Sequence, residues 1–159
     1  MSDLSPQRRY AEHVAVVMSG MGLAPAQGKL FGWLLVAQPP WQTSAQLATE
    51  LGLSKGSVST GMRALETAGL AHRVPLPGRR GHAYEVRPDA IIRIAADPGR
   101  FRVFRELMAQ GVELAGGERS PGAERLVVMR DFYAFIEREL PRLVERFEAE
   151  YGRKESADG

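Results

Sequence analysis

Apolar residues recur at helical spacing along the start of the chain and predict two helices. Between residues 6 and 21 every third or fourth position is apolar, the pattern of an amphipathic helix. These positions are Tyr10, Val14, Val17, Met18 and Met21. Ser5 and Pro6 form a favourable helix start in front of them. The second helix begins at Pro25 and is rich in large apolar residues, so we expect it in the core.

Two shorter helical patterns follow, separated by one glycine. Thr43 and Gln46 fit a capping box at the start of the first. Gly52 is well placed to close that helix in the left-handed conformation. Ser54 can then cap the next helix. Two short helices joined by a tight turn predict a helix-turn-helix.

The second of these helices, residues 54–68, has two unlike faces. Val58, Met62 and Leu65 share one face and would pack inward. The opposite side carries small and hydroxyl-bearing residues with one arginine: Gly56, Ser59, Thr60, Arg63 and Thr67, with Ser57 on a flank and Lys55 at the leading end. Small side chains let a helix backbone approach a grooved partner, and hydroxyls and an arginine can contact phosphates or base edges. This face therefore favours DNA recognition.

From residue 70 the pattern changes to period two. Alternating residues on either side of a Pro-Gly turn predict a β-hairpin, whose tip carries Arg79 and Arg80. Residues 55–87 hold six basic side chains against two acidic ones, a net charge of +4, whereas the whole chain carries only +2. A helix-turn-helix followed by a hairpin with a basic tip predicts a winged helix.

The rest of the chain is again helical in pattern. Asp97-Pro98 and Ser120-Pro121 are favourable helix starts. In the last segment apolar residues repeat at alternating spacings of three and four, which indicates packing against another helix. This seam consists of Leu126, Met129, Tyr133, Ile136, Leu140, Leu143 and Phe147. Pro141 interrupts it and should kink the helix.

Composition excludes several other classes. The chain has no Cys, and therefore no disulfide, thiolate metal site or cysteine nucleophile. His72 and His82 would face each other across the hairpin, but without a third ligand they predict no metal site. No apolar run is long enough for a bilayer, so we expect a soluble, cytoplasmic, nucleoid-associated protein without a membrane partner. No catalytic arrangement stands out, so we expect neither an enzyme nor a cofactor.

Three stretches carry a resemblance to a known family: "MGLAPAQGKLFGWLL", "LATELGLSKGSVSTGMRALETAGL" and "PGRRGHAYEV". Together they resemble bacterial MarR-type winged-helix transcription regulators, most closely the GbsR-like branch. The resemblance covers residues 14–90 well and the flanking helices loosely. It implies a homodimer whose N- and C-terminal helices form the interface. Many such proteins are repressors released by a small molecule, and some GbsR-like members respond to osmolytes such as choline, although no motif here identifies a ligand.

The expected fold class is mainly α with a small β-hairpin, a winged helix-turn-helix flanked by dimerisation helices. Residues 1–24 would be an N-terminal helix in the dimer interface, 25–90 the DNA-binding domain, 91–151 the C-terminal dimerisation region and 152–159 a disordered tail. The candidate DNA contacts are Thr43, Ser44, Ser54, Lys55, Gly56, Ser57, Ser59, Thr60, Arg63, Arg79 and Arg80. The candidate dimer contacts are Tyr10, Val14 and Val17 together with the seven residues of the seam named above.

An effector pocket is a weaker expectation. Phe101, Phe104 and Tyr133 would line one, since an aromatic cage suits a quaternary ammonium ion. Core packing is the better explanation for aromatic residues at helical spacing.

The function expected from these features is sequence-specific regulation of transcription. The partners would be double-stranded DNA, a second copy of the chain and a small-molecule effector, and the protein would act as a ligand-responsive repressor at a palindromic operator. One alternative is a winged helix that binds another protein, which predicts no salt-sensitive affinity for duplex DNA. The other is an architectural DNA binder, which predicts affinity without a consensus sequence.

Overall fold

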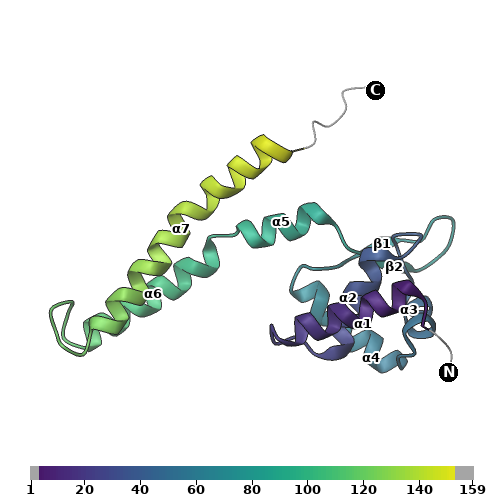
Figure 1. Cartoon of the computed structure of the whole chain (residues 1–159), viewed down its shortest axis with the longest axis horizontal. Coiled ribbons are helices and arrows are strands. Elements are labelled where there is room, and N and C mark those ends of the chain that lie inside the picture. The colour runs from purple at the N-terminus through teal and green to yellow at the C-terminus, as the bar shows by residue number, and fades with distance from the viewer. Residues whose placement is uncertain (1–3, 153–159) are drawn as a thin grey trace. The chain divides into compact units, whose positions relative to one another are not determined.

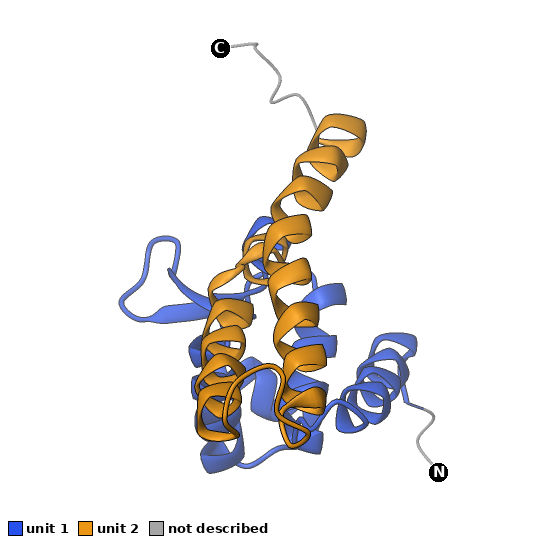
Figure 2. Ribbon diagram, turned by 90° about the vertical axis from the view of Figure 1, so that its left-hand side faces the viewer, with its two compact units in different colours: residues 1–91 blue, residues 92–159 orange. Residues whose placement is uncertain are grey.

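The computed structural model describes residues 4–152 and divides the chain into two compact units, residues 1–91 and 92–159 (Figure 2). The elements follow in the order α1 (Pro6–Ser19), α2 (Pro25–Val36), α3 (Ser44–Leu51), α4 (Lys55–Thr67), β1 (His72–Pro75), β2 (His82–Glu85), α5 (Pro88–Ala96), α6 (Gly99–Leu114) and α7 (Glu124–Tyr151) (Figure 1). The mainly helical fold with one hairpin is confirmed. The tail expected to be disordered lies, from residue 153 onward, outside the described residues.

Local capping sets the ends of the first helices. The Ser5 hydroxyl accepts a hydrogen bond from the Arg8 amide at 3.3 Å at the start of α1. At the start of α3 the Thr43 hydroxyl accepts from the Gln46 amide at 3.2 Å, and the Gln46 side chain accepts from the Thr43 amide at 2.8 Å. Gly52 closes α3 with φ of 62°. The caps predicted at the start of α1 and at both ends of α3 are therefore confirmed.

Helices α1 and α2 pack with almost no side chain between them. A Cβ atom added to Gly28 would lie 2.5 Å from Ala15 Cα, and one added to Gly32 would lie 2.9 Å from Ala11 Cα. Val14 also lies against α2, because its Cβ would be 2.8 Å from the same added atom at Gly32. The N-terminal helix is therefore an integral part of the first unit.

The core of the first unit surrounds α2. Leu30 of α2 and Leu47 of α3 are fully buried, as are Met62 and Leu65 of α4, and Val58 is 1% exposed. The apolar face predicted for residues 54–68 therefore does point inward. It holds α4 against α2 and α3 and leaves the opposite side of the helix to solvent.

The hairpin pairs antiparallel with His72 opposite Glu85 and Pro75 opposite His82. The expectation that His72 and His82 face each other is therefore wrong, because the register places them at opposite ends of the ladder. His72 Nε2 instead lies 2.9 Å from Glu85 Oε1. Among residues 4–152 no group of three or more His, Cys, Asp and Glu residues could hold a metal ion.

A third backbone segment extends this small sheet. The Gln42 amide donates to the Tyr84 carbonyl at 2.9 Å, and the Tyr84 amide donates to the Gln42 carbonyl at 2.8 Å. The link joins the segment before α3 to β2. The sequence pattern did not predict it, since a single bridging residue has no periodicity.

The second unit contains two corrections to the expected helices. Helix α5 was not predicted as a separate helix, although residues 91–151 were expected to be helical. The predicted start at Ser120-Pro121 is wrong, because α7 begins at Glu124. Two turns come first, in which the Ser120 amide donates to the Gly117 carbonyl and the Ala123 amide donates to the Ser120 carbonyl, both at 3.0 Å. The start near Asp97-Pro98 is close to the observed one, since Asp97 Oδ1 accepts from the Gly99 amide at 2.8 Å.

Helix α6 packs against the first half of the longer α7, and ion pairs join the two helices. Glu137 of α7 accepts from Arg105 Nε at 2.6 Å and from Arg102 Nε at 2.9 Å, both on α6. The hydrogen bonds from Arg105 and Arg102 lower the pKa of Glu137 below its usual value. Within the described ranges, no helix has the length and apolar character required to cross a membrane.

Candidate nucleic-acid interface

The outer face of α4 is polar, small and accessible. Ser59, Thr60 and Arg63 are exposed on the side opposite the buried Val58 and Met62. Because those two apolar side chains are almost wholly enclosed, the helix cannot rotate to bury its polar side. The three polar residues can therefore present hydroxyl and guanidinium groups to a partner in fixed positions.

The leading end of α4 is organised by two hydroxyl groups. Ser54 Oγ accepts from the Ser57 amide at 3.1 Å and lies 2.9 Å from Ser57 Oγ. Both serines were predicted DNA contacts; in the structure Ser54 caps the helix start, and its hydroxyl donates to the Ser57 hydroxyl. Lys55 and Gly56 follow Ser54 and are exposed. The end of the helix that carries the positive pole thus also carries a lysine.

Two glycines of α4 differ in their surroundings. A Cβ added to Gly61 would lie 2.5 Å from Leu30 Cδ1, so this glycine allows α4 to approach α2. A Cβ added to Gly56 would find only Ser54 Oγ, at 3.9 Å. Gly61 supports packing, whereas Gly56 leaves the outward backbone open to an approaching partner. The helical spacing placed Gly56 on the outward face, whereas nothing in the sequence pattern singled out Gly61.

A hollow of about 580 Å³ lies between α3, the start of α4 and the hairpin. Cationic and hydroxyl-bearing side chains make up most of its lining: Ser44, Ala45, Ala48, Thr49, Lys55, Ser59, Arg73, His82 and Tyr84. We call it the basic hollow. Ser44, Lys55 and Ser59 were predicted DNA contacts, while Thr49, Arg73, His82 and Tyr84 were not. No local motif marks these four: Thr49 lies on α3, and only the folded hairpin brings Arg73, His82 and Tyr84 beside α4.

Arg73 connects the hairpin to α4. Its Nε donates to Glu66 Oε1 at 2.7 Å and its NH2 group donates to Glu66 Oε2 at 3.3 Å. Its guanidinium carbon also lies 5.8 Å from the centre of the Tyr84 ring. The hydrogen bonds and charge of Glu66 raise the pKa of Arg73 above its ordinary value. This forked contact ties β1 to the second half of α4.

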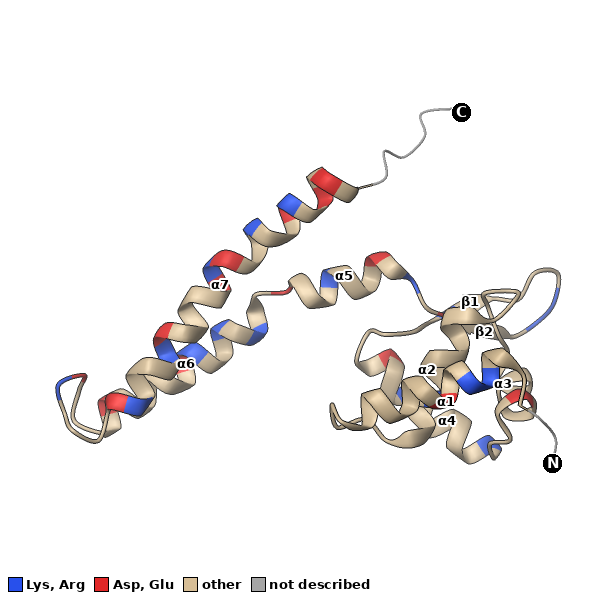
Figure 3. Ribbon diagram, viewed as in Figure 1, with Lys and Arg blue, Asp and Glu red and all other residues tan. Residues whose placement is uncertain are grey.

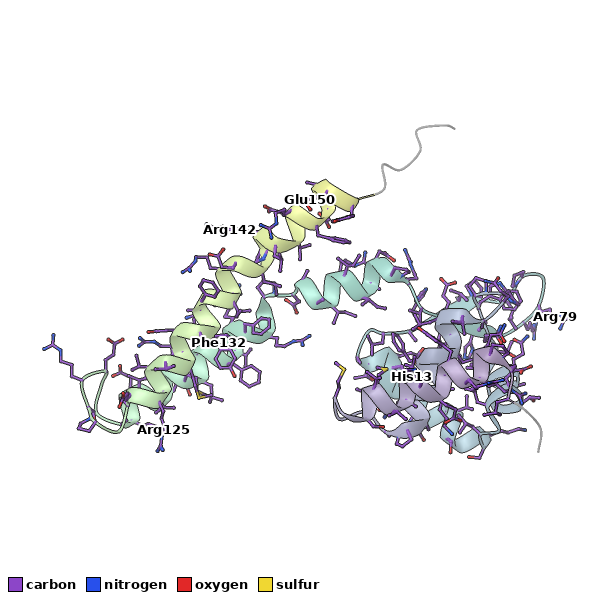
Figure 4. The ribbon with its side chains drawn as sticks, viewed as in Figure 1. His13, Arg79, Arg125, Phe132, Arg142 and Glu150 are labelled. Carbon is purple, nitrogen blue, oxygen red and sulfur yellow. The ribbon has the colours of Figure 1, made fainter. Side chains whose placement is uncertain are left out.

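The remaining predicted contacts lie at two edges of the unit. Thr43 caps α3, so its hydroxyl is already engaged with a backbone amide. Arg79 and Arg80 are exposed on the loop between the strands, where Gly78 and Gly81 have φ of 68° and 109°. Figure 4 shows Arg79 projecting from this loop, and Figure 3 shows basic residues there, whereas acidic and basic residues are mixed along α7.

Comparison with known proteins assigns both halves of the chain. A MarR family model matches residues 21–80, and a model described as MmpR5-like MarR family transcriptional regulator matches residues 89–150. The chain is 33% identical over 131 residues to the HTH-type transcriptional regulator MmpR5 of Mycobacterium tuberculosis, covering 80% of this chain and 78% of that protein. The chain belongs to the MarR family of transcriptional regulators.

A solved structure supports the same assignment. A crystal structure of a transcriptional regulator matches the chain with a TM-score of 0.75 and 29% sequence identity, covering 89% of this chain and 97% of that one. MarR family regulators are DNA-binding transcription factors rather than enzymes, and they typically act as dimers. The predicted family and the absence of an enzymatic role are therefore confirmed.

In this MarR family protein the predicted dimer residues fall into two groups. Leu126 and Tyr133 pack within the chain: Leu126 lies over Gly111 of α6, with its Cδ2 3.1 Å from a Cβ added there, and Tyr133 contacts Phe104. Ile136 and Leu140 are half-buried, as is Val14 on α1. The others are exposed by 43–58%: Tyr10, Val17, Met129, Leu143 and Phe147. The second group is therefore available to a partner chain.

The predicted effector residues form an aromatic contact. Phe104 and Tyr133 stack with ring centres 5.2 Å apart and an angle of 20° between the rings. Phe101, one turn earlier on α6, is half-buried. The stack joins α6 to α7, which is the packing role that the sequence analysis favoured over a pocket.

Proposed function

We propose that this MarR family protein is a homodimeric, ligand-responsive repressor that reads a palindromic operator. The observation that carries the proposal is the exposed polar face of α4, which lies beside the basic hollow and on the same unit as the arginine-tipped wing. Such a surface combines groups that read base edges with cations that bind phosphates.

Each part of the surface has a distinct role in the proposal. Ser59, Thr60 and Arg63 enter the major groove, where an arginine can bond a guanine through two donors. Lys55 and the other polar residues of the basic hollow apart from Ser59 bind the phosphate backbone. Arg79 and Arg80 contact phosphate or the minor groove at the side of the site. Glu66 holds Arg73 at the base of the wing, so Arg73 both joins the wing to α4 and adds a positive charge to the surface.

The dimer supplies the palindrome. Two copies related by a twofold axis place two α4 helices in successive major grooves, about 34 Å apart. The exposed apolar residues Leu143 and Phe147 support a helical interface, because side chains of this size on a regular seam are stabilised by a partner. Repression follows if the operator overlaps a promoter.

Ligand response is the least direct part of the proposal. A small molecule that favoured one dimer geometry would change the spacing of the two α4 helices and lower the affinity for the operator. Placement in the GbsR-like branch also stays a prediction, as does action in the cytoplasm at the nucleoid.

Selection of bound duplexes from a random library tests the proposal, followed by titration of the enriched duplex with wild type, Arg63→Ala and Arg125→Ala. Arg125 is an exposed arginine of α7 and controls for the loss of one positive charge (Figure 4). We expect a palindromic consensus and a loss of about 1–3 kcal/mol for Arg63→Ala, with preference relaxed at one base pair of each half-site. Arg125→Ala should bind as wild type does.

Other results would point to the alternatives. Equal weakening of Arg63→Ala on all sequences would make Arg63 a phosphate contact. Tight, salt-sensitive binding without a consensus would indicate an architectural protein, and an absence of any duplex binding would favour a protein-binding winged helix.

A further inference from the structure

Gln42 is a polar residue with only 3% of its surface exposed. Burying an amide group without hydrogen-bond partners is costly, so its bonds constrain where it can lie. Its Oε1 accepts from Trp33 Nε1 of α2 at 3.3 Å, and its Nε2 donates to the Pro39 carbonyl at 2.8 Å. The two side-chain bonds hold residue 42 to Trp33 of α2 and to the loop that follows this helix.

The backbone of the same residue holds the wing. The two hydrogen bonds between Gln42 and Tyr84, at 2.9 and 2.8 Å, pair it with β2. Strands β1 and β2 have four residues each, and an isolated two-stranded hairpin of this size is only marginally stable. The direction of the wing therefore depends on what holds its base.

Tyr84 connects this support to the DNA-facing surface. It lines the basic hollow, its hydroxyl lies 3.3 Å from His82 Nε2, and its ring lies beneath the Arg73 guanidinium. From Tyr84 the strand leads back to the loop that carries Arg79 and Arg80. A continuous path of hydrogen bonds and strand backbone thus runs from Trp33 through Gln42 to the wing.

We propose that Gln42 is a positioning residue for DNA recognition: its buried amide fixes the wing relative to α4 so that Arg79 and Arg80 reach the duplex. The inference rests on the proposed DNA-binding function and adds a residue that itself touches no DNA. If Gln42 only stabilised the fold, its loss would leave the wing contacts of the folded protein unchanged.

A double-mutant cycle separates the two roles. Gln42→Met keeps an unbranched side chain of similar length but removes both side-chain hydrogen bonds. It is combined with the wing variant Arg79→Ala/Arg80→Ala, and all four proteins are titrated with the selected duplex at several salt concentrations. Unfolding curves establish that each protein is folded under the conditions of the titration.

We expect the wing variant to weaken wild-type binding by about tenfold or more and to reduce the salt slope by about 2, as for the loss of two phosphate contacts. Gln42→Met alone should reduce the slope by a similar amount. In the Gln42→Met background the wing variant should then cost less than about threefold, because the arginines no longer reach the duplex.

Two results would overturn the inference and are distinguishable from each other. If the losses of the two variants simply multiply, the wing contacts DNA but Gln42 does not position it. If the wing variant binds as tightly as wild type, the wing contact of the proposed function is itself wrong. If Gln42→Met fails to fold, Trp33→Phe takes its place in the same cycle. This variant removes the donor to Gln42 Oε1 and keeps an aromatic ring in the core. The expected and contradicting results are the same as for Gln42→Met.

Discussion

The two units of the chain differ in how much of their apolar surface they bury themselves. In the first unit, core residues such as Leu30, Leu47 and Met62 are fully enclosed. Among the described residues of the second unit, the buried ones are Val112 and Ala123. Side chains on α6 and α7 as large as those of the first core are half or more exposed: Val103, Leu107, Leu114, Val128, Phe132, Phe135, Leu143 and Tyr151.

This difference in burial suits the two units to different roles. The first unit contains its own core and can present a fixed polar surface on α4. The second unit leaves many large apolar side chains exposed, which is the character of a surface that another chain covers. The comparison therefore predicts that variants of the first unit act through folding or DNA reading, and variants of the second through assembly.

The largest expected effect is on the folding of the first unit. Gly28→Ala places a Cβ 2.5 Å from the Ala15 backbone, so α1 and α2 must separate. We expect a loss of about 3 kcal/mol in the free energy of unfolding, measured with urea. Gly56→Ala is the matched control, since its Cβ has open space and alanine favours helix; it should gain up to about 1 kcal/mol. Equal stability of the two variants would contradict the close helix contact.

The next effect concerns assembly. Leu143→Glu/Phe147→Glu places two charges on the exposed seam of α7, and we expect the dimer to weaken by about 100-fold or more, since a charge buried in an interface loses its hydration. Sedimentation equilibrium measures it. Arg125→Glu on the same helix should leave the dimer intact. A double variant that remains as strongly dimeric as wild type would place the interface elsewhere.

The smallest expected effect concerns the ion pairs that join α6 to α7 in the second unit. Arg105 and Arg102 lower the pKa of Glu137, so the ionised carboxylate stabilises the folded state above its unfolded pKa, and that stability is lost as pH falls through the folded pKa. Glu137→Gln should therefore unfold more readily than wild type at pH 7. The difference in stability between the two proteins should narrow as the pH falls below the pKa of an ordinary glutamate. The midpoint of urea unfolding, measured between pH 7 and acidic pH, gives this difference, and Glu145→Gln, at an exposed residue, is the control. A difference that stays constant with pH would exclude the ion pairs as its cause.

Elements set by neighbouring residues were predictable from the sequence. The capping box of Thr43 and Gln46, the left-handed Gly52 and the inward face of α4 depend on residues within a turn or two of each other. The exposed polar side of α4 follows from the same periodicity, because a helix that buries Val58 and Met62 must expose Ser59 and Arg63.

Features that join distant segments were not predictable. Gln42 reaches Tyr84, and Arg73 reaches Glu66, only after the hairpin has folded beside α4. The seam of α7 shows the same limit. Its periodicity correctly indicates a partner helix, but the pattern cannot say that Tyr133 packs on α6 of the same chain while Leu143 stays exposed.

The central claim is that the first unit recognises DNA and the second unit forms the dimer. Its most direct test is the mass of the complex between the chain and its selected duplex. The account predicts two chains on one duplex that carries two inverted half-sites about 34 Å apart, and much weaker binding to a single half-site. One chain per duplex at saturation, with equal affinity for the half-site and the full site, would contradict it.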